Sequence, residues 1–195
     1  MSGLSPGFAD PVADAQSCFR AVLDAMSRPG RLRRIAGLTP AAPLGHAAAA
    51  LLMTLVDQET PLWLDPEAAG ARAWIEFHCG APLVEDAGAA MFAFALARPG
   101  LPMPDLTSLC AGTHESPETA ATLILQLPAL GSGRRWRLSG PGLRTPEVLQ
   151  ADGLPADFAV RWQHNHGQFP CGVDLILCAG DTLTALPRSV MIEEA

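Results

Sequence analysis

The chain contains no lysine, and all 13 of its basic side chains are arginines. This absence excludes chemistry that depends on a lysine amine. A Schiff base with pyridoxal phosphate cannot form, and the lysine-bearing phosphate loop of nucleotide hydrolases cannot be present. We therefore expect a protein that uses no pyridoxal phosphate.

Long apolar runs are also missing. Residues 47–56 and 87–97 form the longest runs, and both are well short of the roughly 18 residues that a membrane span requires. The first residues include Asp10 and Asp14 and lack the basic start and apolar core of a signal peptide. We expect a cytoplasmic protein with no membrane partner.

Charge is sparse and mostly negative. Charged residues make up 17% of the chain, and the formal net charge is −7. A domain that binds duplex nucleic acid normally presents a basic face, so we expect no nucleic-acid partner. Hydrophobic residues make up 49%, which is high for a soluble protein and indicates that a partner covers part of the surface.

Metal-ligand patterns are weak. The five cysteines are widely spaced and form no CxxC pair, which is typical of buried, reduced thiols. Residues 114–118 begin like a zinc-protease helix, but Glu118 stands where a second histidine belongs, so a turn before a strand is the simpler interpretation. His164 and His166 could share one face of a strand, but no acidic or cysteine cluster accompanies them, and a helix end with exposed histidines is the simpler interpretation. We expect no bound metal.

Capping residues and apolar periodicity predict four helices. Asp10-Pro11 begins the first helix, which ends at residues 27–30. Its apolar positions recur at helical spacing and should face the core: Val12, Ala15, Phe19, Val22, Leu23 and Met26. The other predicted helices cover residues 44–56 (apolar nearly all round, and so deeply buried), a segment from Asp65-Pro66 through Phe77, and residues 157–164.

Continuous apolar runs predict the strands, which cover residues 62–64, 91–96, 120–127, 136–138 and 173–178, with shorter candidates at 32–35 and 182–185. Strands of this kind are buried on both faces. Alternated with helices, they predict a single α/β domain over residues 1–195, with a central mixed or largely parallel sheet flanked by helices. The expected connections are a Pro/Gly-rich turn at 98–104, a turn at 131–133 and a long surface loop at 143–155.

Two arginine-bearing segments could bind an anion. Residues 140–145 begin like a dinucleotide fingerprint after a strand and bring Arg144 near the arginines of 134–137. The basic run at 28–34 suits phosphate or carboxylate, because a guanidinium group can donate two parallel hydrogen bonds to either. A strand-exit turn for the first segment, and a solvated loop or a partner's acidic surface for the second, are the simpler interpretations.

The ligand-binding hypothesis concerns polar residues around the first buried strand. Asp57, Glu59 and Thr60 precede the strand at 62–64, and His78 should reach the same edge of the sheet. Arg188 completes the candidate set. A capping network at the strand entry is the alternative for the first three residues. No GxSxG elbow or Ser-His-Asp spacing assigns a catalytic residue.

Several ordered stretches of the sequence resemble the PhnH family. They are residues 16–20 (QSCFR), 26–30 (MSRPG), 55–61 (LVDQETP), 77–81 (FHCGA), 117–123 (PETAATL), 140–142 (GPG), 169–174 (FPCGVD) and 186–188 (LPR). They occur in family order and cover nearly the whole chain. Relatives commonly carry tyrosine before the Pro-Glu pair, where this chain has Ser116.

The resemblance implies the H subunit of the bacterial carbon–phosphorus lyase system. This subunit assembles with the G, I and J subunits into the core complex. That system attaches a phosphonate to the ribose of ATP and releases adenine. The H subunit counts as part of the synthase for ribose 1-methylphosphonate 5-triphosphate. The resemblance also implies a homodimer and a fold similar to the large domain of pyridoxal-phosphate-dependent transferases, without that cofactor. It supplies no catalytic residue.

Three functions therefore stand at this point. The apolar surplus and the lack of a catalytic constellation favour an accessory subunit that shapes a synthase site. The first alternative is a free-standing enzyme that uses Asp57, Glu59 and His78 on a phosphorylated small molecule. The second is a small-ligand sensor whose site lies between protomers.

Overall fold

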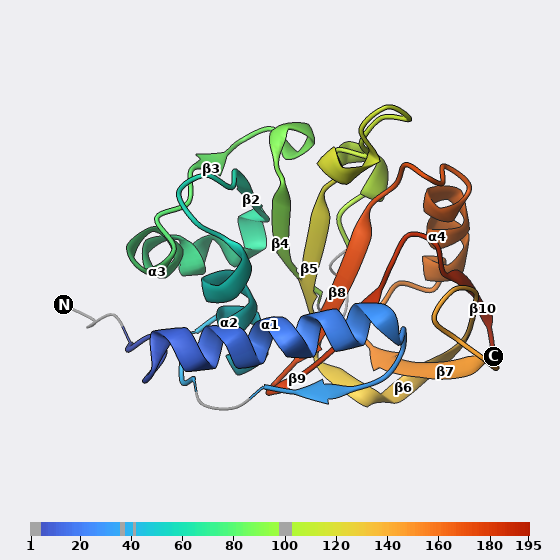
Figure 1. Cartoon of the computed structure of the whole chain (residues 1–195), viewed down its shortest axis with the longest axis horizontal. Coiled ribbons are helices and arrows are strands. Elements are labelled where there is room, and N and C mark those ends of the chain that lie inside the picture. Colours follow the sequence, from blue (N-terminus) through green and yellow to red (C-terminus); the bar gives the residue numbers. More distant parts are fainter. Residues whose placement is uncertain (1–4, 36–37, 41, 98–102) are drawn as a thin grey trace.

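A seven-stranded sheet forms the centre of the computed structural model, which describes residues 5–35, 38–40, 42–97 and 103–195 (Figure 1). The strand order is β1-β9-β8-β5-β4-β2-β3. The strands are β1 (Arg33–Arg34), β2 (Leu62–Leu64), β3 (Leu83–Val84), β4 (Phe92–Leu96), β5 (Thr122–Gln126), β8 (Asp174–Ala179) and β9 (Thr182–Leu186). Strands β3, β2, β4, β5 and β8 are parallel, and β9 is antiparallel to both of its neighbours. The predicted mixed, largely parallel sheet is confirmed.

Helices α1 (Pro11–Ser27), α2 (His46–Leu55) and α3 (Arg72–His78) pack on one face of this sheet. The prediction that the second helix is deeply buried is confirmed, because all six residues from Ala47 to Leu52 are buried. Side chains alternate along the central strands, so Phe94, Ile124 and Ile176 point toward these helices. One hydrophobic cluster therefore joins the helical layer to the sheet.

A second, three-stranded antiparallel sheet covers the other face, together with α4 (Phe158–His166). Its strands are β6 (Ala129–Ser139), β7 (Glu147–Asp152) and β10 (Met191–Glu194), in the order β10-β6-β7. Trp136 and Phe158 meet edge to face with ring centroids 5.6 Å apart, and the Trp162 indole N–H donates to the Val190 carbonyl at 2.7 Å. The strand predicted at residues 136–138 is confirmed within β6, but a separate sheet was not expected.

Two predicted connections are wrong. Residues 131–133 do not form a turn, because β6 runs through them and the pairing with β7 shifts register between Leu130 and Arg134. Gly133 has φ of +88°, and a Cβ there would lie 2.7 Å from the Ala151 carbonyl oxygen, so its glycine permits a bulge pressed against β7. The expected loop at 143–155 contains β7 itself. The expected turn at 98–104 falls largely outside the described residues.

The third predicted helix is split. Asp65 accepts a hydrogen bond from the Glu67 amide at 3.0 Å and caps the segment as expected, but the first turns are the 3₁₀ helix η1 (Pro66–Ala71), and α3 follows. Further 3₁₀ turns are η2 (Ala87–Ala89), η3 (Leu106–Ser108) and η4 (Pro117–Thr119). The last of these confirms a turn at residues 114–118, ahead of β5.

The predicted buried face of α1 is only partly right. The helix buries Cys18, Val22 and Ala25 against α2 and β9, while Phe19 and Leu23 are half exposed. Small side chains let two helices approach closely, and the facing segment of α2 is rich in alanine. The larger apolar residues are thereby left to one side of the contact. They form an exposed stripe, which we call the α1 stripe: Val12, Phe19 and Leu23.

In the described part of the chain, no helix is long and apolar enough to cross a membrane.

Two buried thiols and the partly buried thiol of Cys79 should react slowly in the folded protein. Burial raises the pKa of Cys18 and Cys178, and it raises the pKa of Cys79 from 9.0 to about 12. A rise of that size at Cys79 lowers the thiolate fraction at pH 8 roughly a thousandfold, and the thiolate is the reactive form. Mass spectrometry after iodoacetamide treatment should find Cys79 unmodified in native protein and alkylated in urea. Equal rates in the two conditions would contradict this placement.

Candidate functional site

The Asp57–Thr60 segment is a closed turn at the entry to β2. The Asp57 carboxylate accepts from the Glu59 amide at 2.9 Å, and the Thr60 hydroxyl donates to the Asp57 carbonyl at 3.0 Å. The Asp57 amide in turn donates to the Thr60 hydroxyl oxygen at 2.6 Å. These bonds match the capping alternative, although the outward face of Asp57 and the Glu59 side chain remain exposed.

His78 is the last residue of α3 and shortly precedes β3, the strand that pairs with β2. Its Nε2 lies 3.1 Å from the Ser5 carbonyl, and its ring packs against Trp74 with centroids 4.4 Å apart. No hydrogen bond joins it to Asp57, Glu59 or Thr60 within the ranges that the structure describes. The expected shared edge is present, because Asp57 and His78 precede neighbouring strands, but the histidine is tied to the N-terminal segment.

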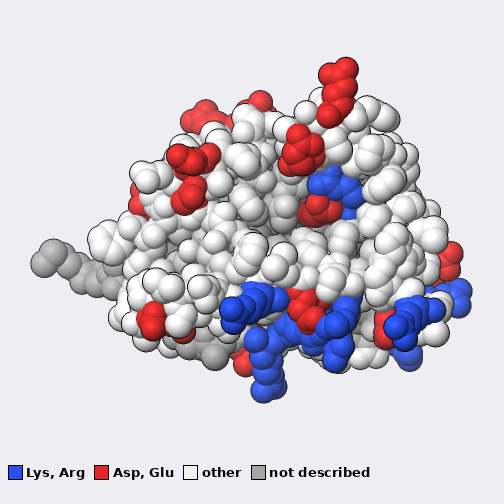
Figure 2. Space-filling model, viewed as in Figure 1, with Lys and Arg blue, Asp and Glu red and all other residues white. Residues whose placement is uncertain are grey.

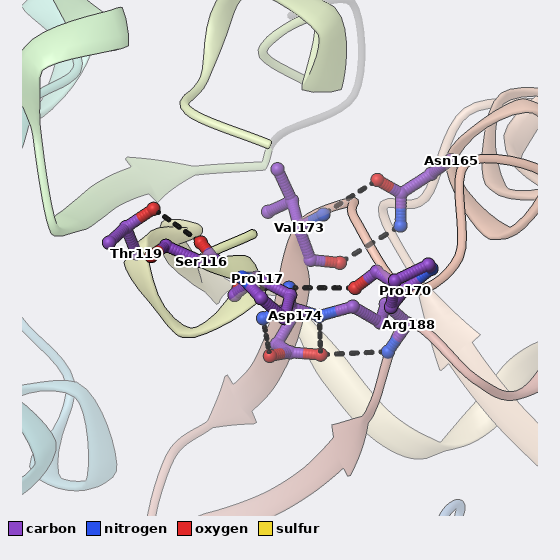
Figure 3. A network of polar contacts seen from close by, with 8 residues as sticks. All are labelled: Ser116, Pro117, Thr119, Asn165, Pro170, Val173, Asp174 and Arg188. Atoms are coloured by element: carbon purple, nitrogen blue, oxygen red, sulfur yellow. Dashed lines mark hydrogen bonds and ion pairs between the residues drawn. The ribbon is translucent and has the colours of Figure 1, made fainter. Parts of the chain in front are cut away.

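Arg188 is the centre of a polar network at the start of β8 (Figure 3). Its Nη2 and Nε donate to the two oxygens of the Asp174 carboxylate at 2.5 and 3.1 Å. Its Nη1 donates to the Pro117 carbonyl at 2.8 Å and to the Pro170 carbonyl at 3.4 Å. The Arg188 side chain is 13% exposed and that of Asp174 is 21% exposed. The guanidinium group thus fastens three chain segments together.

The neighbouring residues extend this network toward α4. The Asn165 side chain donates to the Val173 carbonyl at 2.9 Å and accepts from the Val173 amide at 2.8 Å. His166 places Nδ1 2.9 Å from the Arg188 carbonyl. His164 and His166 lie in the last turn of α4, not on a strand. Among the described residues, no three His, Cys, Asp or Glu side chains gather as a metal site would require.

The five predicted ligand residues do not converge. Residue pairs run in register from Leu62 on β2 through β4 and β5 to Asp174 on β8, which places the Asp57 turn and Arg188 about 14 Å or more apart. Both lie at the amino ends of the parallel strands. Open α/β sheets usually bind ligands at the carboxyl ends instead. The ligand-binding hypothesis for these residues therefore stays a prediction without a shared pocket.

The two arginine-bearing segments do come together. Arg28 and Arg31, which follow α1, face Arg144 and Glu147, which lie at the β6–β7 connection, across a cleft of about 530 Å³. We call this the arginine cleft. The cleft lies between the helical layer and the second sheet. The two walls are far apart in the sequence, and the one signal there that relates them is the glycine, proline and arginine that both segments contain.

Glycine holds the two walls of the arginine cleft together. Gly142 has φ of +84°, and a Cβ there would lie 2.6 Å from the Ser27 carbonyl oxygen. Gly30 has φ of +82°, and a Cβ there would lie 2.5 Å from a Leu138 methyl carbon. A larger residue at either position would strain the backbone, and at position 142 it would also collide with backbone of the opposite wall. Close approach of Gly142 to the Ser27 carbonyl thus sets the width of the cleft.

Charge is unevenly distributed on the face shown in Figure 2. Most basic side chains lie in its lower half, over α1 and the second sheet and with a few acidic side chains among them, whereas the upper edge is mainly acidic. The arginine cleft belongs to the basic side. This polarity is invisible in the net charge of −7, which averages over both sides.

The comparison with known proteins decides the family. The profile of the family described as bacterial phosphonate metabolism protein (PhnH) matches residues 6–193. The chain belongs to the PhnH family. Two curated relatives agree with that membership. A Rhizobium meliloti (strain 1021) protein named alpha-D-ribose 1-methylphosphonate 5-triphosphate synthase subunit PhnH is 38% identical over 97% of this chain and 95% of its own length. A Stutzerimonas stutzeri protein named putative C-P lyase subunit protein HtxG is 32% identical over 91% of this chain and 85% of its own length.

The Arg188–Asp174 pair should contribute strongly to stability. Replacing Arg188 with methionine removes the guanidinium from two carbonyls and from a largely buried carboxylate, which keeps only the Arg188 amide as a donor at 2.8 Å. We therefore expect Arg188→Met to lower the free energy of unfolding on the order of 3 kcal/mol. Arg137→Met is the matched control, since Arg137 pairs with Glu193 at 3.2 Å but both side chains are more than half exposed. The control should cost less than about 1 kcal/mol. Urea denaturation followed by tryptophan fluorescence measures both. Equal losses would show that Arg188 is not a structural clamp.

Proposed function

We propose that this chain is the H subunit of a carbon–phosphorus lyase system and supports synthesis of alpha-D-ribose 1-methylphosphonate 5-triphosphate from ATP and methylphosphonate. The observation that carries the proposal is the match to the PhnH family over residues 6–193. Two relatives, aligned over most of their own lengths, are named as subunits of this synthase or of a C-P lyase. The proposed role is accessory, which the naming of both relatives as subunits supports.

The proposed fold family is that of the large domain of pyridoxal-phosphate-dependent transferases. A seven-stranded sheet with β9 antiparallel inside a largely parallel order supports this likeness. The cofactor itself does not fit, because no lysine exists to form its Schiff base. One domain is supported by the second hydrophobic cluster, which joins central-sheet residues such as Leu123 to Trp136 and Ile192 of the second sheet.

The proposed partners are a second copy of this chain and the G, I and J subunits. The α1 stripe supports a covered surface, because Val12 is 70% exposed and Leu23 is 53% exposed on one side of a helix. Exposed apolar residues that line up in this way are typical of protein contacts. The free-standing enzyme and the ligand sensor remain the alternatives. Turnover by the isolated protein would favour the enzyme.

Assembly and turnover test the proposal directly. The wild-type chain co-expressed with the G, I and J subunits should co-purify with them, as measured by native mass spectrometry. Alone it should release no adenine from ATP and methylphosphonate, and deleting its gene should abolish growth on methylphosphonate as sole phosphorus source. Adenine release by the isolated chain would replace the accessory role with a free-standing enzyme. Failure to co-purify would contradict the subunit role.

The same assay sorts the predicted ligand residues. Charge-removing changes at Asp57, Glu59, His78 or Arg188 that assemble normally but abolish adenine release would assign the residue to the shared site. Changes that loosen assembly would assign it to structure or interface. If all four variants assemble and turn over like the wild type, the ligand-binding hypothesis is wrong.

The α1 stripe yields a separate prediction. Phe19→Glu combined with Leu23→Glu should weaken self-association or subunit binding at least about tenfold, because each change places a charge in an apolar contact. Val160→Glu is the control, since Val160 is 67% exposed on α4, outside the stripe. Sedimentation velocity and co-purification measure the two kinds of contact. Wild-type behaviour of the double variant in both would remove the stripe from the interface.

A further inference from the structure

The arginine cleft contains positive charge that the protein does not neutralise. Arg28 pairs with Asp24, and Asp24 also pairs with Arg33. Arg31 and Arg144 form no ion pair with any residue in the described ranges, whereas Arg134 and Arg137 on β6 pair with Glu194 and Glu193. Bringing several guanidinium groups to one cleft costs repulsion, and a bound anion would relieve it.

Residues next to these arginines are packed against the core. The Leu143 side chain, directly before Arg144, packs against the second hydrophobic cluster, and its amide donates to the Gly140 carbonyl at 3.2 Å. On the other wall Pro29 follows Arg28 and precedes Gly30, which packs on Leu138. Anchoring of this kind lowers the entropy lost when a ligand orders the segment.

Size and charge together indicate the class of ligand. A cleft of about 530 Å³ falls within the range typical of small-molecule sites, on the order of 300–1,000 Å³. Guanidinium groups match phosphate oxygens with paired hydrogen bonds, and three of them suit a chain of phosphates better than a single one. Glu147 repels a further anion but can accept a hydrogen bond from a hydroxyl group, such as that of a sugar.

We propose that the arginine cleft binds the polyphosphate chain of a small phosphorylated ligand, with Arg28, Arg31 and Arg144 as its cationic contacts. The proposal stands on the geometry of this chain and does not require the subunit role. A sugar polyphosphate and a nucleoside triphosphate share the chemistry that the cleft recognises. The comparison of ATP with tripolyphosphate below decides whether the nucleoside adds to recognition of the phosphate chain.

Isothermal titration calorimetry on the full chain in about 0.1 M salt tests the proposal, with tripolyphosphate, ATP and adenosine as probes. Tripolyphosphate and ATP should bind and adenosine should not. The double variant Arg31→Gln/Arg144→Gln should bind both anions at least about tenfold more weakly, because it removes two charge-assisted contacts. Tighter binding of ATP than of tripolyphosphate would assign the ligand to the nucleotides, and equal binding would show that the phosphate chain alone is recognised.

The matched control is Arg72→Gln/Arg161→Gln, which removes the same charge from exposed helix pairs on α3 and α4. It should bind within about twofold of the wild type, since salt screens distant surface charges. Thermal unfolding verifies that both double variants are folded. The proposal is overturned if neither anion binds at millimolar concentration, if the control weakens as much as the cleft variant, or if adenosine binds as tightly as ATP.

A protein partner is the competing occupant, and co-purification with the G, I and J subunits identifies it. If the cleft variant loses assembly and wild-type protein binds no anion, the cleft is a protein contact and this inference is wrong. If anions bind as expected but no assembly forms with any variant, the subunit role fails and the cleft assignment survives. The two failures are therefore distinguishable.

Discussion

The rest of the structure depends on burial of the central strands on both faces. Along β4, β5 and β8, successive side chains enter two different hydrophobic clusters, one shared with α1, α2 and α3 and the other with the second sheet and α4. Neither layer could be removed without exposing half of each central strand. The same constraint forces functional polar groups to the sheet edges and to the seams between layers, where the Arg188 network and the arginine cleft lie.

The parts of the fold that the sequence predicted correctly are those with one dominant signal. The central strands are continuous apolar runs. A short run such as residues 122–126 is typical of a strand that is buried on both faces. Within the second sheet only the strand at 136–138 was predicted, because β6 and β7 are amphipathic and β6 carries glycines that resemble turn signals. The α1 face was partly wrong because periodicity counts large apolar residues, whereas the contact with α2 selects small ones.

The candidate sites were harder to predict, for a physical reason. Asp57 and His78 were correctly expected at one sheet edge, because chain order fixes which end of a parallel strand each precedes. Distance along that edge depends on strand order, which separates the Asp57 turn from Arg188 by the width of β4 and β5. The arginine cleft depends instead on how distant elements pack. Its two walls, around residues 28 and 144, meet because an unpredicted sheet packs beside the end of α1.

The close approach of Gly142 to the Ser27 carbonyl means that different residues determine the shape and the charge of the arginine cleft. Because backbone atoms fix the spacing of the walls, the side chains at positions 28, 31 and 144 can change without redrawing the outline of the cleft. Relatives could therefore exchange these side chains for others and retune what the cleft accepts, as long as both glycines persist. The two glycines would then determine the shape of the cleft, and the side chains at positions 28, 31 and 144 would determine which ligand it binds.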